Sequence, residues 1–438
     1  MRRWNSVIVN ASVSPKSGGS QARHPAKTFF RPWRTRLQTA GIPGHDDYDG
    51  GSPEFGAIGE VGEVDLRLAG RKLNETIMPH QMLSEDGLIR VIQHTVKSRG
   101  RVQLGIGDDA AVLNDGTVIT TDAYAEGVHF GLSYMTLRQV GERCACGAIS
   151  DVVAMAAEPE AVFVSLALPH RALCPASHGR RRAKVLSVKQ QVRQLYTGID
   201  SVCAEMGCEV AGGDIIVTGR LLLALTVTGK ARRPKLRSGA QPGDRLYVTG
   251  YLGSAEAGRM VLSSEVRMQK SESGIRSDGH RGPVYGARFT GSDRRLPLIG
   301  RHLRPVPRLE VMRELRSFMH GLIDTSDGLA TDARHLSEMS GVKIVLEADA
   351  LPVLPATKEF CAGRGFDPLV FVLRAGEDYE LLFTSSRRVP SSVRGVKVTE
   401  IGSVQEGGGL WISRAGKTSP VRVSGYDHLK VGGDWKTC

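Results

Sequence analysis

The chain has 438 residues, of which 41% are hydrophobic, and a formal net charge of +12. A chain of this length usually folds into two or three domains, and two is our starting estimate. Its apolar runs end after about nine residues, whereas a helix needs roughly 20 apolar residues to cross a bilayer. We therefore expect a soluble protein without membrane-spanning helices.

The positive charge is concentrated in two segments. Residues 1–44 carry eight Lys or Arg and residues 170–193 carry seven, and neither segment contains an acidic residue. Neither has the interleaved aromatic residues or the recognisable module of a nucleic-acid-binding surface. We therefore do not expect nucleic acid to be the main partner.

Seven cysteines are scattered along the chain, an odd number without the Cys-x-x-Cys pairs of a zinc site. This pattern is typical of reduced thiols and predicts a cytoplasmic protein. Cys144 and Cys146 fall within a helical pattern, where we interpret them as small core residues.

The chain up to residue 81 is rich in Gly, Ser, Pro and Arg and has no sustained hydrophobic periodicity. Such a segment buries too little apolar surface to offset its ordering entropy, so we expect residues 1–81 to form a disordered basic extension. Residues 1–44 resemble a transit peptide in composition, but residues translated from upstream of the natural start would look the same. We favour the second interpretation.

From Ser84 onwards, helical and strand-like patterns alternate, which predicts a mixed α/β protein. Ser84 can cap a first helix that stops at Gly100. Further helical patterns cover residues 136–158, 185–207, 253–264, 306–319 and 328–340. Strand-like runs cover residues 117–121, 161–168, 221–229, 245–250, 342–348 and 379–384.

A break near residues 234–243 divides these patterns into two series. We predict an N-terminal ATP- and Mg²⁺-binding domain, residues 82–232, and a C-terminal domain, residues 236–435. Residues 265–297 form a polar insertion rich in Gly and Ser. We interpret this insertion and the basic segment 170–193 as surface loops.

Five short acidic motifs are the most informative part of the sequence. The first, GIGDDAAVL at 105–113, sets Asp108 and Asp109 directly after two glycines that allow a tight turn. The second, TTDAYAEGVHF at 120–130, places Asp122 at the end of an apolar strand, where ligands gather in α/β folds. The third is Asp151, which lies in an otherwise apolar helical pattern, so that a cation or a hydrogen-bond donor should face it.

The fourth and fifth motifs lie further along the chain. In AGGDIIVTG at 211–219, Asp214 follows two glycines, which we interpret as a turn that lets a ligand approach closely. The fifth, IDTSDGLATD at 323–332, offers Asp324, Ser326 and Asp327 just before a helix. Taken alone, Ser326 or Asp327 is best interpreted as the N-cap of that helix.

Acidic motifs without nearby His or Cys pairs favour hard cations, above all Mg²⁺ held by a few carboxylates and by substrate phosphates. The five motifs together therefore predict Mg²⁺-dependent chemistry on a polyphosphate. A P-loop is excluded, because Trp411 stands where the motif around Gly416 requires a glycine. We interpret residues 415–420 as a polar turn between strands.

Nine motifs, in this order, resemble those of the thiamine-monophosphate kinase family, and the resemblance runs from about residue 84 to residue 430. They are GIGDDAAVL, TTD followed by EGVHF, SDVVAMAAEP, GGD, RSGAQPGD, HLRPVPRLE, DTSDGL, GEDYELLFT and GYDHL. The family shares its fold with aminoimidazole ribonucleotide synthetase, selenophosphate synthetase and a hydrogenase maturation factor. The resemblance implies a homodimer, joined through the sheet of an N-terminal α/β domain, with a C-terminal α/β domain that closes over the nucleotide. It also implies that ATP phosphorylates thiamine monophosphate to thiamine diphosphate.

The resemblance further implies roles for individual residues. His129, Glu377 and Tyr426 would border thiamine monophosphate. The residues at the nucleotide would be Gly213, Asp214, Arg237 and Ser326, with Asp151, Asp214 and Arg237 as the catalytic set. The Mg²⁺-binding set would be Asp109, Thr120, Thr121, Asp122, Asp151, Asp214, Asp324 and Asp327. Considered without the family, His129 is a core histidine, Glu377 a turn acid and Tyr426 a core residue.

Two positions depart from the family pattern. Ala148 stands where Asn is common, and Ile215 stands where Thr commonly follows the GGD motif. Both changes remove a polar group near the predicted metals, so one alternative is a nucleotide-binding member with impaired catalysis. A second alternative is another enzyme of the same superfamily. Against it, no reactive-cysteine loop precedes Gly105, and Cys438 lacks the Pro-Arg-Ile context of the maturation factor.

Overall fold

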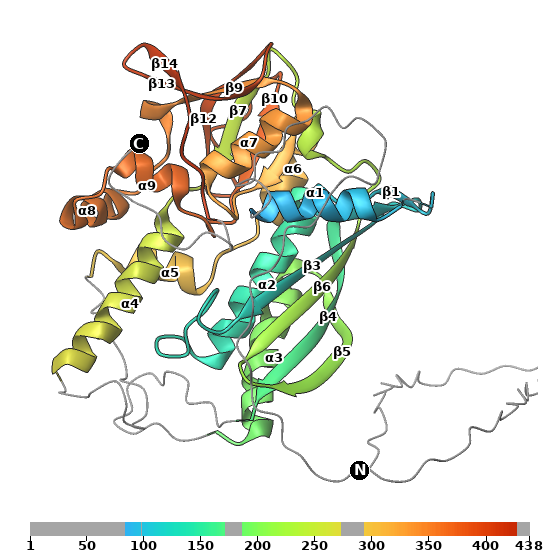
Figure 1. Ribbon diagram of the computed structural model, residues 1–438, viewed down its shortest axis with the longest axis vertical. Coiled ribbons are helices and arrows are strands. Elements are labelled where there is room, and N and C mark those ends of the chain that lie inside the picture. Colours follow the sequence, from blue (N-terminus) through green and yellow to red (C-terminus); the bar gives the residue numbers. More distant parts are fainter. Residues whose placement is uncertain (1–83, 98, 171–185, 273–292, 427–438) are drawn as a thin grey trace, which may run out of the picture. The chain divides into compact units, whose positions relative to one another are not determined.

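The structure, a computed structural model, describes residues 84–97, 99–170, 186–272 and 293–426, without the side chains of 266–272. All of them belong to one compact unit, Asn74–Cys438, which contains two sheets and their helices (Figure 1). The extension predicted to be disordered, residues 1–81, lies outside the described residues.

The first sheet has six strands in the order β1-β2-β3-β6-β4-β5. Strands β4 and β5 are parallel, and the other neighbours are antiparallel. The strands are β1 (Val102–Leu104), β2 (Ala111–Leu113), β3 (Thr117–Ala125), β4 (Glu158–Pro169), β5 (Glu209–Thr218) and β6 (Leu222–Lys230). Their Val, Ile, Leu and Thr residues suit a pleated, half-buried surface.

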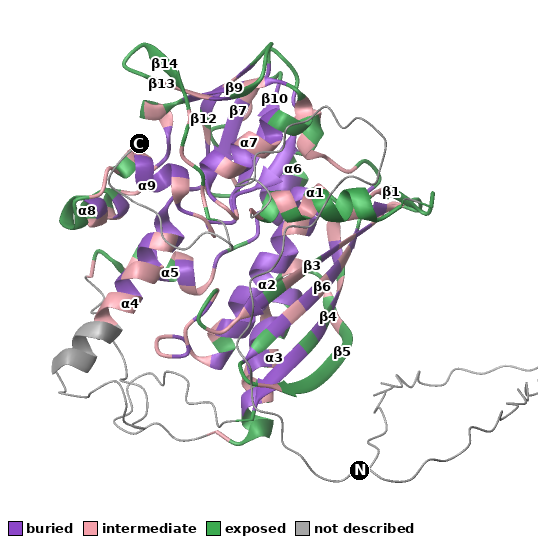
Figure 2. Ribbon diagram, in the orientation of Figure 1, coloured by how far each residue is buried: buried purple, intermediate pink, exposed green. Residues whose placement is uncertain are grey.

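Helices α2 (Leu137–Ala154) and α3 (Val188–Met206) pack against this sheet and against each other (Figure 1). Each begins with a capping box, in which a Ser or Thr stands three residues before a Gln. Helix α2 is buried along almost its whole length (Figure 2), and Cys144 and Cys146 are core residues as predicted. The helices approach closely at glycines, since a Cβ at Gly141 would lie 2.1 Å from the carbonyl oxygen of Leu195.

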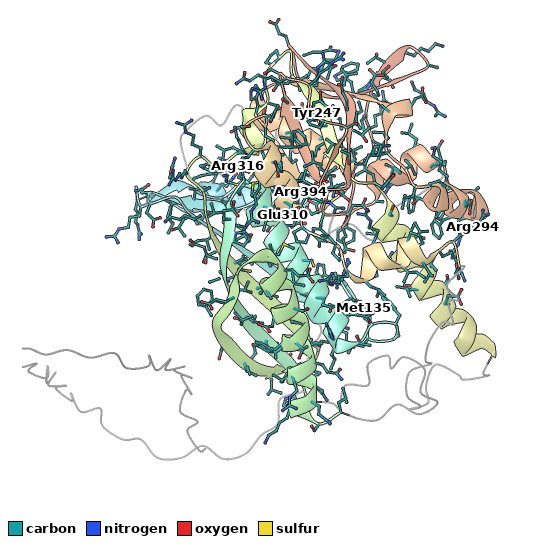
Figure 3. The ribbon with its side chains drawn as sticks, turned by 180° about the vertical axis from the view of Figure 1, so that it is seen from behind. Met135, Tyr247, Arg294, Glu310, Arg316 and Arg394 are labelled. Atoms are coloured by element: carbon teal, nitrogen blue, oxygen red, sulfur yellow. The ribbon has the colours of Figure 1, made fainter. Side chains whose placement is uncertain are left out.

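The second sheet has the order β14-β13-β9-β12-β7-β10-β8, and β11 pairs with β12. Strands β9 and β13 are parallel, and the remaining pairs are antiparallel. Tyr247 of this sheet stacks on Phe383 with a centroid distance of 5.4 Å (Figure 3). The strands are β7 (Arg245–Thr249), β8 (Leu322–Asp324), β9 (Lys343–Glu347), β10 (Leu381–Ser385), β11 (Ser392–Val393), β12 (Val396–Gln405), β13 (Gly409–Arg414) and β14 (Lys417–Pro420).

In the part of the chain that the structure describes after residue 236, six α-helices and two short 3-10 helices occur between and beside the strands of the second sheet. The α-helices are α4 (Ser254–Glu272), α5 (Leu296–Leu303), α6 (Leu309–Leu315), α7 (Leu329–Ser340), α8 (Pro355–Arg364) and α9 (Pro368–Arg374). The 3-10 helices are η2 (Arg237–Gly239) and η3 (Ala348–Ala350). Within the described residues, no helix combines the length and the apolar composition that a membrane span requires.

Helix α1 (Glu85–Thr95) precedes the first sheet. The hydroxyl of Ser84 caps it as predicted, accepting a hydrogen bond of 3.1 Å from the backbone N–H of Gly87. The helix ends before the predicted stop at Gly100. It contacts α7 through an ion pair of 3.4 Å between Asp86 and His335.

The mixed α/β prediction is confirmed, because each predicted helical pattern overlaps a helix and each strand-like run overlaps a strand. The polar turn predicted at residues 415–420 is confirmed only at Ala415 and Gly416, because the remaining four residues form strand β14, which pairs with β13. The two-domain boundary near residue 234 stays a prediction, although it falls between the last strand of the first sheet and the first strand of the second.

Three predictions about loops and turns are wrong. Asp214 lies within β5, not in a turn, because Gly213 lets β5 approach β4: a Cβ there would lie 1.9 Å from the carbonyl oxygen of Val164. The polar insertion 265–297 is not a loop at its ends, since α4 continues to Glu272 and α5 begins at Leu296. The basic segment 170–193 likewise ends within α3; the rest of both segments lies outside the described residues.

Candidate active site

Three aspartates from distant parts of the chain converge at one point. Asp109 follows the first glycine-rich turn, Asp151 lies on α2, and Asp324 is the last residue of β8. Each offers a carboxylate oxygen, and these oxygens all lie within 4.8 Å of one another. The cluster therefore draws ligands from both sheets.

Hydroxyl groups orient two of these carboxylates. Ser150 donates a hydrogen bond of 2.6 Å to Asp324, and Thr120 donates one of 2.7 Å to Asp151. Each bond occupies one carboxylate oxygen and leaves the other for the cluster. Because Ser150 lies on α2 and Asp324 on β8, the first bond also joins the two halves of the described chain.

Strand β3 presents its residues alternately to its two faces. Asp122 accepts a hydrogen bond of 2.7 Å from the buried hydroxyl of Tyr124, on the same face as Thr120. Thr121 is on the opposite face, where its hydroxyl lies 2.9 Å from that of Thr226. Thr120 and Asp122 therefore lie on the face of the aspartate cluster, whereas the Thr121 side chain does not.

Burial and mutual repulsion raise the pKa values of Asp324, Asp151 and Asp122. Burial raises the pKa of Asp324 to about 7, and the charge of Asp109 adds to the effect. Burial, followed by the charges of Asp122, Asp324 and Asp109, raises the pKa of Asp151 well above its ordinary value. Burial also raises the pKa of Asp122. Full ionisation of this set requires a compensating cation.

The donor set fits a hard divalent cation. Asp109 Oδ2 and Asp324 Oδ1 are buried and have no hydrogen-bond partner among the described residues, which is costly for carboxylate oxygens. Oxygen ligands alone, without His or Cys, suit Mg²⁺. The geometry therefore fits the predicted metal.

Arg237 connects the second half of the chain to the first glycine-rich turn. Its Nη2 lies 2.6 Å from Asp109 Oδ1, and its backbone N–H donates a hydrogen bond of 3.2 Å to Asp108. Burial, with the neighbouring charge of Asp109, raises the pKa of Asp108 to about 6, and Arg237 opposes the rise. The guanidinium is thus held beside the cluster.

The loop before α7 differs from the prediction made from its motif alone. Gly328 is the N-cap residue, and its N–H donates a hydrogen bond of 3.0 Å to Asp332 in the first turn. Neither Ser326 nor Asp327 caps the helix, so the N-cap interpretation is wrong. Burial raises the pKa of Asp327 to about 6, and the charge of Glu85 adds to the rise.

The three residues predicted at the acceptor lie near one another. His129 Nδ1 accepts a hydrogen bond of 3.1 Å from the N–H of Ala125, and Glu377 forms an ion pair of 2.6 Å with the buried Arg143. Tyr426 is 52% exposed, so it is not a core residue, and its N–H donates to the carbonyl oxygen of Asp327 at 2.8 Å.

Most of the predicted residues line one cleft with a volume of about 2660 Å³. Small-molecule sites usually have about 300 to 1,000 Å³, so this cleft has room for two substrates. Asp324 lies fully buried beside it. The predicted residues in its lining are Asp109, Thr120, Thr121, Asp122, His129, Asp151, Arg237, Ser326, Asp327, Glu377 and Tyr426.

Two predicted residues lie elsewhere. Gly213 and Asp214 are on β5, the edge strand of the first sheet, and they do not line the cleft. Figure 2 shows this strand as exposed, and Ile215, Ile216 and Val217 beside Asp214 are 53–57% exposed. The structure of the single chain therefore does not bring Asp214 to the aspartate cluster.

Several residues that line the cleft or lie behind its lining were missed by sequence reasoning. Tyr124 follows Asp122 by two residues, so the strand period alone could have placed both on one face. Arg143 is a charged residue within a helix of small apolar residues, which is also a detectable signal. Glu256 and Arg259 form a two-bond ion pair of 2.6 Å in the lining. The three-residue spacing of Glu256 and Arg259 on α4 did not indicate a site, because such pairs are common on exposed helices.

The first sheet and its helices match one known class of domain. The family model "AIR synthase related protein, N-terminal domain" matches residues 107–231, which extend from the first glycine-rich turn through β6 and include Asp109, Asp122 and Asp151.

The relatives narrow this class to one family. The chain is 33% identical over 350 residues to thiamine-monophosphate kinase from Aquifex aeolicus, which covers 79% of this chain and 98% of that one. It is 32% identical over 358 residues to the enzyme of the same name from Salmonella typhimurium, with coverages of 78% and 97%. A solved structure, AaThiL complexed with AMPPCP and TMP, is similar with a TM-score of 0.64 and 32% identity, covering 81% of this chain and 100% of that one. This chain belongs to the thiamine-monophosphate kinase family.

Proposed function

We propose that this protein uses ATP to phosphorylate thiamine monophosphate to thiamine diphosphate, with Mg²⁺ as the required metal. The observation that carries the proposal is the convergence of Asp109, Asp151 and Asp324 within 4.8 Å in a cleft of about 2660 Å³. The complex of the similar protein AaThiL with AMPPCP and TMP supports the choice of substrates. The family and the consumption of ATP agree with the predicted cytoplasmic location.

The charges of the two substrates define what the site must do. ATP carries about four negative charges and a phosphate monoester nearly two at neutral pH, so they repel each other strongly. Within one chain, the residues proposed to hold Mg²⁺ are Asp109, Thr120, Asp122, Asp151, Asp324 and Asp327. The resemblance also implies Thr121 and Asp214, whose side chains lie away from the cluster in the single chain. When bound there, the metal supplies positive charge that neutralises the phosphates.

The side chains of the cleft then orient the two phosphates. Arg237, held by Asp108 and Asp109, faces the donor phosphates together with Ser326. A terminal oxygen of thiamine monophosphate attacks the γ-phosphorus in line, the bond from that phosphorus to the bridging oxygen breaks, and ADP leaves. Because the attacking oxygen is already largely ionised, no strong general base is needed. Catalysis comes from positioning and from charge neutralisation.

At the acceptor end we assign contacts to His129, Glu377 and Tyr426. Tyr426 offers an exposed aromatic ring that suits stacking on a heteroaromatic substrate. His129 already accepts a hydrogen bond at Nδ1 and packs edge-on against Tyr124, so we treat it as a substrate contact and not as a base.

We also propose a homodimer joined through the first sheet. Ile215, Ile216 and Val217 form an exposed apolar row on β5, and Phe163 on the neighbouring strand is 40% exposed. Such a row is typical of a surface that another chain covers. Association there would place Gly213 and Asp214 at the interface, which would account for their distance from the cluster of their own chain.

The test is an assay of product formation. Purified protein is incubated with ATP, Mg²⁺ and thiamine monophosphate, and the products are separated chromatographically. Thiamine diphosphate is expected, and its formation should stop when EDTA removes the metal. ATP binding without turnover would overturn the proposal in favour of an impaired member, the alternative raised by Ala148 and Ile215. Neither of these positions lines the cleft: Ala148 is fully buried in α2 and Ile215 is exposed on β5.

A further inference from the structure

Arg143 is the largest fully buried side chain of the described residues. It lies on α2, eight residues before Asp151, and its neighbours along the helix are Cys144, Ala145 and other small buried residues. A buried guanidinium is costly unless its donors are paired. Its partners therefore reveal what the position is built to hold.

The donors of Arg143 reach three separate elements. Nε donates a hydrogen bond of 3.1 Å to the carbonyl oxygen of His129, in the loop after β3. Nη1 donates to the carbonyl oxygen of His302, at the end of α5. Nη2 lies 2.6 Å from the Glu377 carboxylate, in the loop before β10. One planar group thus joins both predicted acceptor residues, His129 and Glu377, to the helix layer.

The backbone at Glu377 needs such support. Its φ is +62°, a left-handed conformation that costs free energy for a residue with a side chain and persists only where its surroundings enforce it. Its N–H donates a hydrogen bond of 2.7 Å to the carbonyl oxygen of Ser326, so the same residue also adjoins the loop at the nucleotide. The ion pair with Arg143 fixes the side chain that this backbone presents.

We propose that Arg143 is the positioning residue of the acceptor end of the cleft, setting the separation of His129 and Glu377 so that thiamine monophosphate is held for in-line attack. This inference rests on the proposed function and adds a residue to it. Arg143 itself does not line the cleft, so it acts through the two residues that do.

A second buried arginine provides a matched control. Arg308 pairs with Glu380, three residues after Glu377, through two bonds of 2.5 Å, and it is 8% exposed. Neither Arg308 nor Glu380 lines the cleft. Glu380 also pairs with Arg301 at 2.6 Å, so it keeps a partner when Arg308 is removed. The two arginines thus differ in what they hold and resemble each other in burial.

The experiment compares Arg143→Met, Arg143→Lys and Arg308→Met with the wild type. Thermal unfolding, kcat and the KM for each substrate are measured, together with the Kd of thiamine monophosphate by calorimetry. We expect Arg143→Met to raise the KM and Kd for thiamine monophosphate about tenfold or more and to change the KM for ATP less than about twofold. Lys keeps the charge but reaches fewer partners, so it should restore part of the loss. Arg308→Met should lower the unfolding temperature without changing either KM.

The outcomes separate the two proposals. A wild type that forms no thiamine diphosphate overturns the proposed function, and the calorimetric Kd then still tests Arg143. Equal changes in the KM of both substrates, or a lower unfolding temperature with an unchanged KM and Kd for thiamine monophosphate, overturn the positioning role alone. If Arg143→Met fails to fold, Arg143→Lys decides: an unchanged KM and Kd for thiamine monophosphate in the folded Lys variant contradicts the proposal.

A combined Arg143→Met and Glu377→Gln variant should bind thiamine monophosphate no more weakly than the worse single variant, because both changes break the same ion pair.

Discussion

Asp151 and Asp214 both belong to short acidic motifs in the part of the chain that forms the first sheet, yet the structure places them in opposite environments. Asp151 lies on α2, receives a hydrogen bond from Thr120 and belongs to a cluster with Asp109 and Asp324. Asp214 lies on the edge strand β5 beside the exposed Ile215, Ile216 and Val217.

This difference indicates which parts of the site a single chain completes by itself. Helix α2 packs against the first sheet, α3 and β8, and this packing half-buries Asp151, which raises its pKa and creates the need for a cation. No helix packing of this kind encloses Asp214 within the described residues. We therefore predict large effects at the cluster, and effects at β5 that depend on association.

Removing the charge of Asp151 should have the largest effect. In Asp151→Asn, kcat is expected to fall on the order of a thousandfold, because one metal-binding charge is lost while the side-chain volume is kept. The unfolding temperature in EDTA should be unchanged or higher, since the substitution removes a carboxyl group whose ionised form is repelled by the neighbouring aspartates. Steady-state kinetics and thermal unfolding measure both quantities. Near-normal turnover would contradict the assignment of the cluster as the metal site.

Asp324 should make stability depend on pH when no metal is present. Its pKa is about 7 in the folded protein against an ordinary value of 3.8, so between these values the folded state binds more protons than the unfolded state. Stability relative to Asp324→Asn should therefore fall by a few kcal/mol as pH rises from about 4 to about 7, and change little above that.

The measurement is thermal unfolding of both proteins in EDTA across this pH range. The proposed Mg²⁺ site requires the ionised carboxylate, so adding Mg²⁺ above pH 7 should stabilise the wild type by more than it stabilises Asp324→Asn. A difference between the two proteins that stays constant with pH would show that Asp324 does not titrate in this window.

A charge on β5 should separate the contribution of association from that of the cluster. Ile216→Lys is expected to shift the protein from dimer to monomer and to lower activity about tenfold or more, with little change in the stability of the chain, because Ile216 is 53% exposed. Sedimentation velocity and turnover measure the two effects. Thr418→Lys, on the exposed edge strand β14 of the second sheet, is the matched control and should change neither. A fully active Ile216→Lys monomer would mean that one chain carries a complete site.

The smallest effect is expected at Tyr426. Tyr426→Ala should raise the KM for thiamine monophosphate severalfold through loss of one stacking contact, whereas Tyr426→Phe should retain most of the affinity. The KM for ATP, measured in parallel, should stay constant. Equal effects of Ala and Phe would show that the hydroxyl, and not the ring, makes the contact.

Periodicity and spacing in the sequence were sufficient for much of the fold. The strand-like run 117–121 predicted β3, and the Ser or Thr to Gln spacing agrees with the capped starts of α2 and α3. The turn predicted at AGGD is wrong, because a glycine that permits a turn also permits close approach of two strands. The N-cap predicted at Ser326 or Asp327 is wrong for a similar reason, since residues suited to an N-cap are equally suited to a loop that binds a ligand.

The sequence by itself determined the class of fold, the order of the acidic motifs and the family to which they belong, because these depend on local chemistry and spacing. Only the tertiary structure decided which acids meet. Asp109, Asp151 and Asp324 are 42 and 173 residues apart along the chain, and their carboxylates converge because α2 packs against both β3 and β8. The same packing leaves Asp214 on an edge strand. It also brings the buried Arg143 to Glu377, a contact that the local sequence around neither residue predicts.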